Sequence, residues 1–186
     1  MILAAHQPNF IPWLSFFAKM QQSDVFVLMS HCQWEKNGFQ NRCQVNGKWW
    51  TKPVNGGLIP IKDKTYTDGQ NLLDVNYSWI MAIAKTLSID VSKIEMDFET
   101  EARGTQRLIE LCLRYKCDKY LTNPDAMTKY LDESLMNKAG IEVIPFTFPH
   151  KLHVFEAFDK FGIEGTINLL NSEKSKCEMS RNSSVI

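Results

Sequence analysis

Four histidines and several side-chain amides fall where the sequence predicts loops, and these residue types can bind a substrate and move a proton. An imidazole changes its charge near neutral pH, so it can take a proton from an attacking amine or hold a carboxylate. His6 is the strongest candidate for a catalytic base because it directly follows the first apolar run. Asn9 lies in the same segment and suits either a ligand contact or the cap of the next helix.

A second group of candidate ligands lies in the polar segment 30–42. The guanidinium of Arg42 can hold a phosphate or carboxylate through paired hydrogen bonds, and Lys36 adds a second positive charge. The rings of Trp34 and Phe39 can stack on a sugar or base, or pack inward beneath a solvated loop. The other predicted substrate-binding residues are Gln7, Gln33, Asn41, Asn123 and His150.

We predict no metal site. His150 and His153 are only two possible ligands, whereas zinc in proteins takes roughly three or four His, Cys or carboxylate ligands. The chain has 5 cysteines and no Cys-x-x-Cys pair, so most are expected to be small core residues or free thiols. The sequence identifies no cofactor, and it lacks a glycine-rich phosphate loop, a Gly-x-Ser-x-Gly elbow and a His-Glu-x-x-His helix.

The elements that must position these residues alternate between strand and helix. Strands are predicted at 2–5, 24–29, 119–122 and 141–146. The run of apolar residues within 24–29 does not alternate with polar residues, as expected for a parallel strand that is covered on both faces. Helical spacing of apolar residues predicts helices behind Pro12, over 75–87, over 104–117 and over 165–170. A further helix is predicted from Pro124 to a stop at Gly140, with its apolar face formed by Met127, Tyr130, Leu131 and Leu135.

Together these elements predict an α/β fold: an open, mainly parallel sheet with helices on both faces and an inserted β-hairpin over 43–54. Asn46-Gly47 favours the hairpin because a type I′ turn needs positive φ at both central residues. Residues 58–61 predict another short strand, and 62–69 an exposed polar connection. We expect one domain over 1–171, followed by a polar tail over 172–186 with too little apolar content to pack.

The position of the histidines agrees with a general rule for such sheets. Open parallel sheets bind ligands beyond the carboxyl ends of their strands. His6 follows the first predicted strand, His31 follows the second, and His150 and His153 follow the last. All four histidines therefore fall at the predicted ligand-binding edge.

Charge and composition limit how this chain can bind a nucleic acid or a membrane. The chain has 186 residues, of which 44% are hydrophobic, which is typical of a globular protein. The 21 Lys and Arg residues balance 21 Asp and Glu residues, so a nucleic acid or an anionic membrane would have to be bound by a local patch. The opening apolar run is broken at His6, so we expect a cytoplasmic protein without a signal peptide or membrane span.

Several segments resemble the WbqC-like family. The most specific is residues 6–13 (HQPNFIPW), and the resemblance continues through 24–27, Gln33, Lys36, 39–42, 50–54, 120–121, 130–132, 139–143 and 167–171. Ser30 and His31 stand where the family usually has two acidic residues. The resemblance implies a place in bacterial O-antigen or other surface-polysaccharide biosynthesis, where glycine or a related acyl transfer to an amino sugar has been suggested.

These observations predict a transferase that moves a glycyl, other aminoacyl or acyl group onto an activated, nucleotide-linked amino sugar. In this scheme His6 accepts a proton from the amine, Lys36 and Arg42 hold a phosphate or carboxylate, and Asn9 or Asn41 orients the amine. The bound anion is expected where His6, Asn9 and Arg42 converge. Two alternatives stay open: amino-acid transfer in viral DNA base hypermodification, and a non-enzymatic protein that binds a nucleotide sugar.

Overall fold

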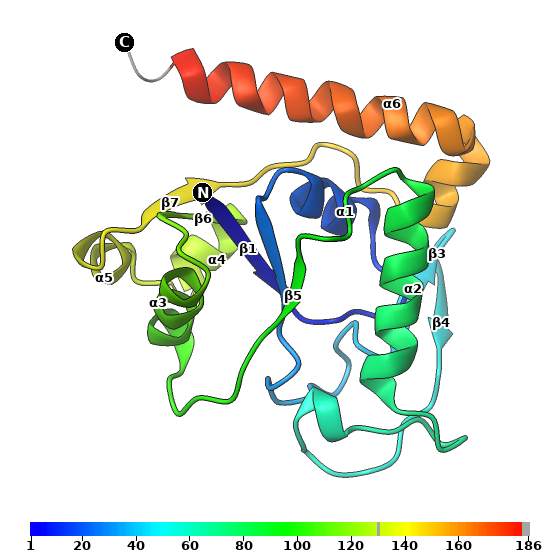
Figure 1. Ribbon diagram of the computed structural model, residues 1–186. Coiled ribbons are helices and arrows are strands. Elements are labelled where there is room, and N and C mark those ends of the chain that lie inside the picture. Colours follow the sequence, from blue (N-terminus) through cyan, green and yellow to red (C-terminus); the bar gives the residue numbers. More distant parts are fainter. Residues whose placement is uncertain (130, 184–186) are drawn as a thin grey trace.

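A computed structural model describes residues 1–129 and 131–183, and a five-stranded parallel sheet forms its centre (Figure 1). The strand order is β5-β2-β1-β6-β7, so β1 (Ile2–His6) lies in the middle. The other strands are β2 (Val25–Leu28), β5 (Ile94–Met96), β6 (Lys119–Thr122) and β7 (Glu142–Pro145). Every pair in this sheet is parallel, which confirms the predicted α/β fold.

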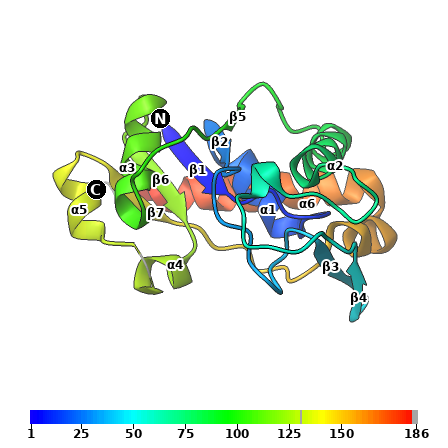
Figure 2. The same ribbon diagram turned by 90° about the horizontal axis from the view of Figure 1, so that it is seen from below.

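Helices cover both faces of the sheet (Figures 1 and 2). One apolar cluster joins Ala4 and Phe26 to the helices α1 (Leu14–Gln21), α2 (Leu72–Thr86) and α6 (Val154–Ser183). A second cluster joins Leu3 and Val27 to α3 (Gly104–Arg114), α4 (Pro124–Lys129) and α5 (Glu133–Lys138). Successive strand residues point to opposite faces, so β1, β2, β6 and β7 each contribute to both clusters.

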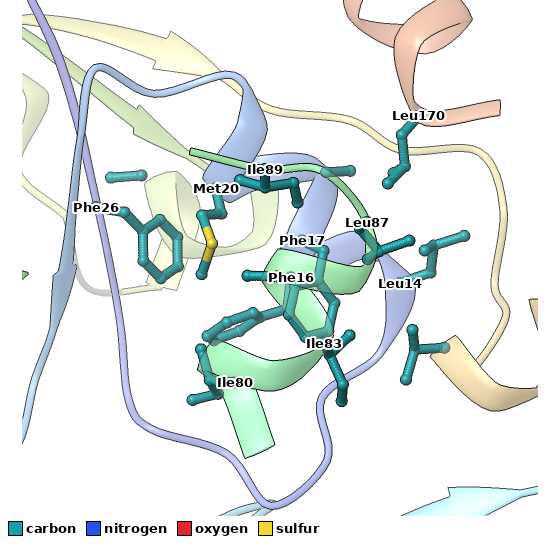
Figure 3. Close-up of a cluster of buried hydrophobic side chains, with 14 of the residues drawn as sticks. Leu14, Phe16, Phe17, Met20, Phe26, Ile80, Ile83, Leu87, Ile89 and Leu170 are labelled. Carbon is teal, nitrogen blue, oxygen red and sulfur yellow. The ribbon is translucent and has the colours of Figure 1, made fainter. Parts of the chain in front are cut away.

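The larger cluster is built around α1, which lies between the sheet and α2 (Figure 3). Phe16 contacts Phe17 and the strand residue Phe26 edge-to-face, with ring centroids 5.4 and 5.1 Å apart. Ile80 and Ile83 of α2 complete the cluster. This packing fixes α1 directly behind the first strand, and the loop that carries His6 to Trp13 is fixed with it.

The predicted hairpin is confirmed. β3 (Arg42–Val45) and β4 (Lys48–Thr51) pair antiparallel and form a separate two-stranded sheet (Figure 1). Asn46 has φ 49° and Gly47 has φ 73°, as a type I′ turn requires.

The segment between the hairpin and α2 differs from its prediction. No strand forms over 58–61; a short 3₁₀ turn, η1 (Ile61–Asp63), follows Pro60 instead. The exposed connection predicted over 62–69 is also wrong, because Lys64 and Tyr66 are fully buried. Tyr66 donates a 2.7 Å hydrogen bond to Asn76, and Lys64 donates a 2.6 Å hydrogen bond to the carbonyl of Gly57. Internal partners therefore compensate these polar groups for burial.

One predicted helix is divided in two, and one strand was not predicted. The single helix expected from Pro124 to Gly140 is two helices, because Asp132 leaves helical geometry and caps α5 by accepting a 3.0 Å hydrogen bond from the Leu135 amide. Tyr130 lies outside the described residues. β5 was not predicted, since its three residues at the sheet edge are partly exposed and too few to give a pattern.

The C-terminal helix is longer than the short helix predicted over 165–170. α6 runs from Val154 to Ser183 with a non-helical residue at Gly162 (φ 70°), so most of the predicted polar tail is helical, and residues 184–186 lie outside the description. Lys176 and Glu173 form an ion pair at 2.7 Å, one helical turn apart, which supports the exposed part of the helix. None of the described helices combines the length and apolar character that a membrane span requires.

Truncation of Phe17 tests the packing of α1. Phe17 is fully buried, so Phe17→Ala removes a large apolar side chain and leaves a cavity, and should cost about 3–5 kcal/mol of the free energy of unfolding. Phe39→Ala is the control; its side chain is exposed, and the loss should stay below about 1 kcal/mol. Urea denaturation measures both, and equal losses would contradict the assigned core.

Candidate functional site

A cavity of about 650 Å³ opens at the carboxyl ends of β1, β2 and β6. After β1 the chain adds β2 and β5 on one side of it, and later adds β6 and β7 on the other. This reversal of strand order is a topological switch point, where the loops leaving neighbouring strands diverge and open parallel sheets bind their ligands. The cavity therefore lies where the fold itself favours a site.

The cavity brings together only part of the predicted set of site residues. His6, Gln7, Gln33 and Asn123 line it. Asn9, Lys36, Asn41, Arg42 and His150 are not among its lining residues. Candidate ligands from three different strand-end loops thus meet in one place, as the rule for parallel sheets predicts.

The residues outside the cavity have other contacts. Asn41 donates a 3.1 Å hydrogen bond to the carbonyl of Lys52, next to the hairpin. Arg42 donates a hydrogen bond to the carbonyl of Asn37, and its guanidinium lies 4.2 Å from the centre of the Trp49 ring. His150 lies 3.6 Å from the carboxylate of Glu173 on α6. The expected convergence of His6 and Arg42 on one anion is therefore absent from this cavity.

His6 is held as a neutral imidazole with one nitrogen available. Its Nδ1 lies 3.0 Å from the carbonyl oxygen of Gln7, which can only accept, so Nδ1 carries the proton and Nε2 has a lone pair. The ring also packs edge-to-face on Phe16, with centroids 4.9 Å apart. Desolvation, and then the positive charge of Lys19, lower the pKa of His6 to about 4. At neutral pH the ring is therefore neutral, and the lone pair of Nε2 can accept a proton.

Lys19 is the most unusual residue of the cavity wall. Its side chain comes from α1 and is only 5% exposed, yet it lines the cavity. Among the described residues no carboxylate pairs with it, and its amino group makes one long hydrogen bond of 3.4 Å to the carbonyl of Ala5. Burial lowers the pKa of Lys19 to about 8, so it is still mainly protonated at pH 7. A buried positive charge without a counter-ion favours an anionic ligand.

Asp97 organises the opposite wall. Its side chain is fully buried and follows the end of β5. The carboxylate accepts hydrogen bonds from the backbone amide of Ser30 (2.7 Å), the hydroxyl of Ser30 (2.8 Å) and Nδ1 of His31 (2.9 Å), and it pairs with Arg107. Burial alone would raise the pKa of Asp97, but the hydrogen bonds from His31, Ser30 and Arg107 outweigh it and hold the pKa below its usual value.

One carboxylate thus fixes two side chains that line the cavity, His31 and Arg107. Arg107 is 6% exposed, and its Nε is buried without a hydrogen-bond partner in the described part of the chain. Arg103 also lines the cavity, next to Gly104 at the start of α3. In the described part of the chain, three basic side chains, Lys19, Arg103 and Arg107, and one acidic side chain, Glu35, line the cavity, and Asp97 balances Arg107 from behind the wall.

Sequence reasoning did not find Lys19, Asp97, Arg103 or Arg107. A signal existed for two of them, because Lys19 interrupts an apolar turn of α1 and Arg107 precedes the apolar stripe that begins at Leu108. No local signal pointed to Asp97, because the strand that it follows was not predicted. Within residues 1–129 and 131–183, no three His, Cys, Asp or Glu side chains gather as ligands for a metal ion.

Comparison with known proteins assigns the family. The sequence model of the WbqC-like protein family matches residues 7–65 and 57–161, which include both the opening loop and most of the sheet. The chain belongs to the WbqC-like protein family. This confirms the resemblance found in the sequence.

One relative of this WbqC-like protein is an uncharacterised protein of Mycobacterium tuberculosis (strain ATCC 25618 / H37Rv). The two are 24% identical over 190 residues, which cover 78% of this chain and 82% of the relative. No solved structure matches the chain significantly. The function therefore has to be argued from the cavity.

Removal of the Asp97 charge tests the arrangement of the opposite wall. Asp97→Asn leaves Arg107 as a buried cation without its partner, and should cost about 3–5 kcal/mol of the free energy of unfolding at pH 7. The matched variant Asp97→Asn/Arg107→Met removes both charges, so its loss should be smaller than the sum of the two single losses. Additive losses in urea denaturation would show that the two side chains do not interact.

The same variant gives a pH dependence with a defined sign. Because folding lowers the pKa of Asp97, its stabilising contribution is complete above the unfolded value of about 3.9 and is lost as pH falls through the lower folded value. The stability difference between the wild type and Asp97→Asn should therefore shrink in acid. A difference that is constant from neutral to acidic pH would contradict the assigned role of the charge.

Proposed function

We propose that this WbqC-like protein is a transferase that moves an aminoacyl or acyl group onto the amino group of a phosphate-bearing, nucleotide-linked sugar in surface-polysaccharide biosynthesis. The observation that carries the proposal is Lys19, a buried cation that lines the cavity and has no carboxylate partner among residues 1–129 and 131–183. A substrate phosphate supplies the missing negative charge. The volume of about 650 Å³ is in the range of small-molecule sites.

The basic side chains of the cavity wall support a phosphate-bearing substrate more strongly than Lys36 and Arg42 of the polar segment 30–42 do. Lys19, Arg103 and Arg107 are the cations of the cavity, and they take the place expected for Lys36 and Arg42. The unpartnered Nε–H of Arg107 is a buried donor that a phosphate oxygen can satisfy. Gly104, the first residue of α3, also lines the cavity, and the N-terminus of a helix favours an anion.

The other lining residues supply what a transfer to an amine requires. In the proposed reaction, Nε2 of His6 accepts a proton from the nitrogen that attacks the acyl carbon. The amides of Gln7, Gln33 and Asn123 can donate to or accept from sugar hydroxyls and so orient the acceptor. A base of low pKa suits a nitrogen that has already attacked the carbonyl, because its remaining protons are far more acidic than those of the free amine.

The Lys19 charge gives a direct test with inorganic pyrophosphate as the probe. Lys19→Met should weaken pyrophosphate binding at pH 7 by about tenfold or more, since a hydrogen bond to a charged group contributes roughly 1.5–3 kcal/mol. Wild-type affinity should fall as pH rises through and above about 8, where Lys19 loses its proton, and the variant should lack this fall. Isothermal titration calorimetry at neutral and alkaline pH measures both.

The matched control is Lys93→Met. Burial lowers the pKa of the half-buried Lys93, as it does that of Lys19, but Lys93 donates to the backbone carbonyls of Gln21 and Ser23 and is not among the residues that line the cavity. The affinity of Lys93→Met for pyrophosphate should equal that of the wild type. Equal binding by Lys19→Met and the wild type would overturn the proposed anion site.

His6→Gln separates catalysis from binding. It should reduce turnover about 100-fold or more, the usual contribution of a positioned base, while the melting temperature and pyrophosphate affinity stay near wild-type values. The assay pairs amino-sugar nucleotides with aminoacyl phosphates and acyl thioesters as donors and detects the amide by mass spectrometry. A wild type that binds the nucleotide sugars but forms no amide with any donor would identify a binding protein and reject the transferase.

A further inference from the structure

His31 is the second imidazole of the cavity wall, and its position is more strongly fixed than that of His6. The buried carboxylate of Asp97 accepts from the ring Nδ1 at 2.9 Å and from the His31 backbone amide at 3.2 Å. Side chain and main chain are thus tied to one group, which cannot move because Ser30 and Arg107 hold it from other directions. Since Nδ1 is occupied, Nε2 is the nitrogen that His31 offers to the cavity.

The two imidazoles of the cavity lie in opposite electrostatic surroundings. His6 lies near the positive charge of Lys19, which opposes a second positive charge on its ring. His31 instead contacts a carboxylate, which accepts from its Nδ1 and holds the ring in one orientation. The ring of His31 is 21% exposed, so it reaches the cavity while the side chain of Asp97 stays buried behind it. One cavity therefore holds two imidazoles, and a buried carboxylate positions one of them.

The protonated amino group of an amino-sugar acceptor must lose two protons during acyl transfer. Near neutral pH much of its amine is the ammonium form, which has no lone pair with which to attack. One proton must leave before the nitrogen attacks the acyl carbon, and a second must leave after the attack to give a neutral amide. These protons differ greatly in acidity, so two bases of different strength serve better than one.

We propose that His31, positioned by Asp97, is a second acid–base residue of this transferase and removes the first proton from the ammonium group of the acceptor. The inference rests on the proposed function. Nε2 of His31 takes this proton, and the freed nitrogen lone pair forms the bond to the acyl carbon. The bond from that carbon to the phosphate or thiolate of the donor breaks, and the leaving group keeps the electron pair. Nε2 of His6 takes the second proton, and both histidines return their protons to water after the amide leaves.

The test compares His31→Ala with His31→Gln in the amide-forming assay. Both should reduce kcat about 100-fold, while KM and the affinity for pyrophosphate change by less than about threefold, because the lost group moves a proton and does not hold the anion. Added imidazole should restore turnover in His31→Ala, where it can occupy the vacated space, but not in His31→Gln, whose side chain fills that space. Imidazole should not stimulate the wild type.

Asp97→Glu tests the positioning role, because it keeps the charge and displaces it by one methylene. It should lower kcat, and imidazole should not rescue it because His31 is still present. Because Asp97 also holds Arg107, KM for the phosphate-bearing acceptor should rise as well. Turnover of both His31 variants within about threefold of the wild type would overturn the proposal. A loss that is matched by equal losses in pyrophosphate affinity and melting temperature would also overturn it, by assigning His31 to structure. An inactive wild type would reject the proposed transferase itself, whereas an active wild type with active His31 variants would reject only this role.

Discussion

The cavity depends on the parallel alignment of β1 with both of its neighbours. Leu3 pairs with Val25 of β2 on one side and with Tyr120 of β6 on the other, so the three strands end at nearly the same level. Helices pack on the two faces of these strands, with α1 on one face and α3 on the other (Figures 1 and 2). An antiparallel neighbour would send a hairpin across this edge and close the space between the loops.

The residues at this edge lower the stability that the rest of the fold provides. Lys19 buries an amino group with only one long hydrogen bond, and Arg107 has a buried Nε–H without a partner in the described residues. Such groups cost free energy, so they persist only where the surrounding structure compensates for them. Two extensive apolar clusters, one on each face of the sheet, supply that compensation. Departures from the usual rules of burial that gather at one cavity are typical of a functional site.

The sequence was sufficient for elements with a strong local pattern. β1, β2, β6 and β7 were predicted because each contains a short group of adjacent apolar residues, and the hairpin because Asn46-Gly47 specifies its turn. β5 is short and lies at the sheet edge, where exposed residues give no apolar run. α6 was predicted too short because its later turns depend on charged pairs, which an apolar pattern does not register.

The sequence predicted residues of the candidate site only where they directly follow a predicted strand. His6, Gln7, Gln33 and Asn123 were found because each follows a strand that the sequence reveals. Arg42 was chosen for its charge alone, and the hairpin directs it to Trp49 instead. Asp97 lies 66 residues from His31 and follows the strand that was missed, so no local pattern could join them. Long-range pairs of this kind require the three-dimensional structure.

In the proposed transferase, Lys19 links substrate binding to the strength of the base. Its positive charge is one cause of the low pKa of His6, after desolvation. An anion bound at Lys19 offsets that charge and so removes one cause of the low pKa of His6, while desolvation of the ring still acts. Linkage requires the converse, because a protonated His6 then favours the bound anion. His31 is held by the buried Asp97 carboxylate, so its position does not depend on Lys19. Substrate binding at Lys19 would therefore strengthen His6 as a base and leave the placement of His31 unchanged.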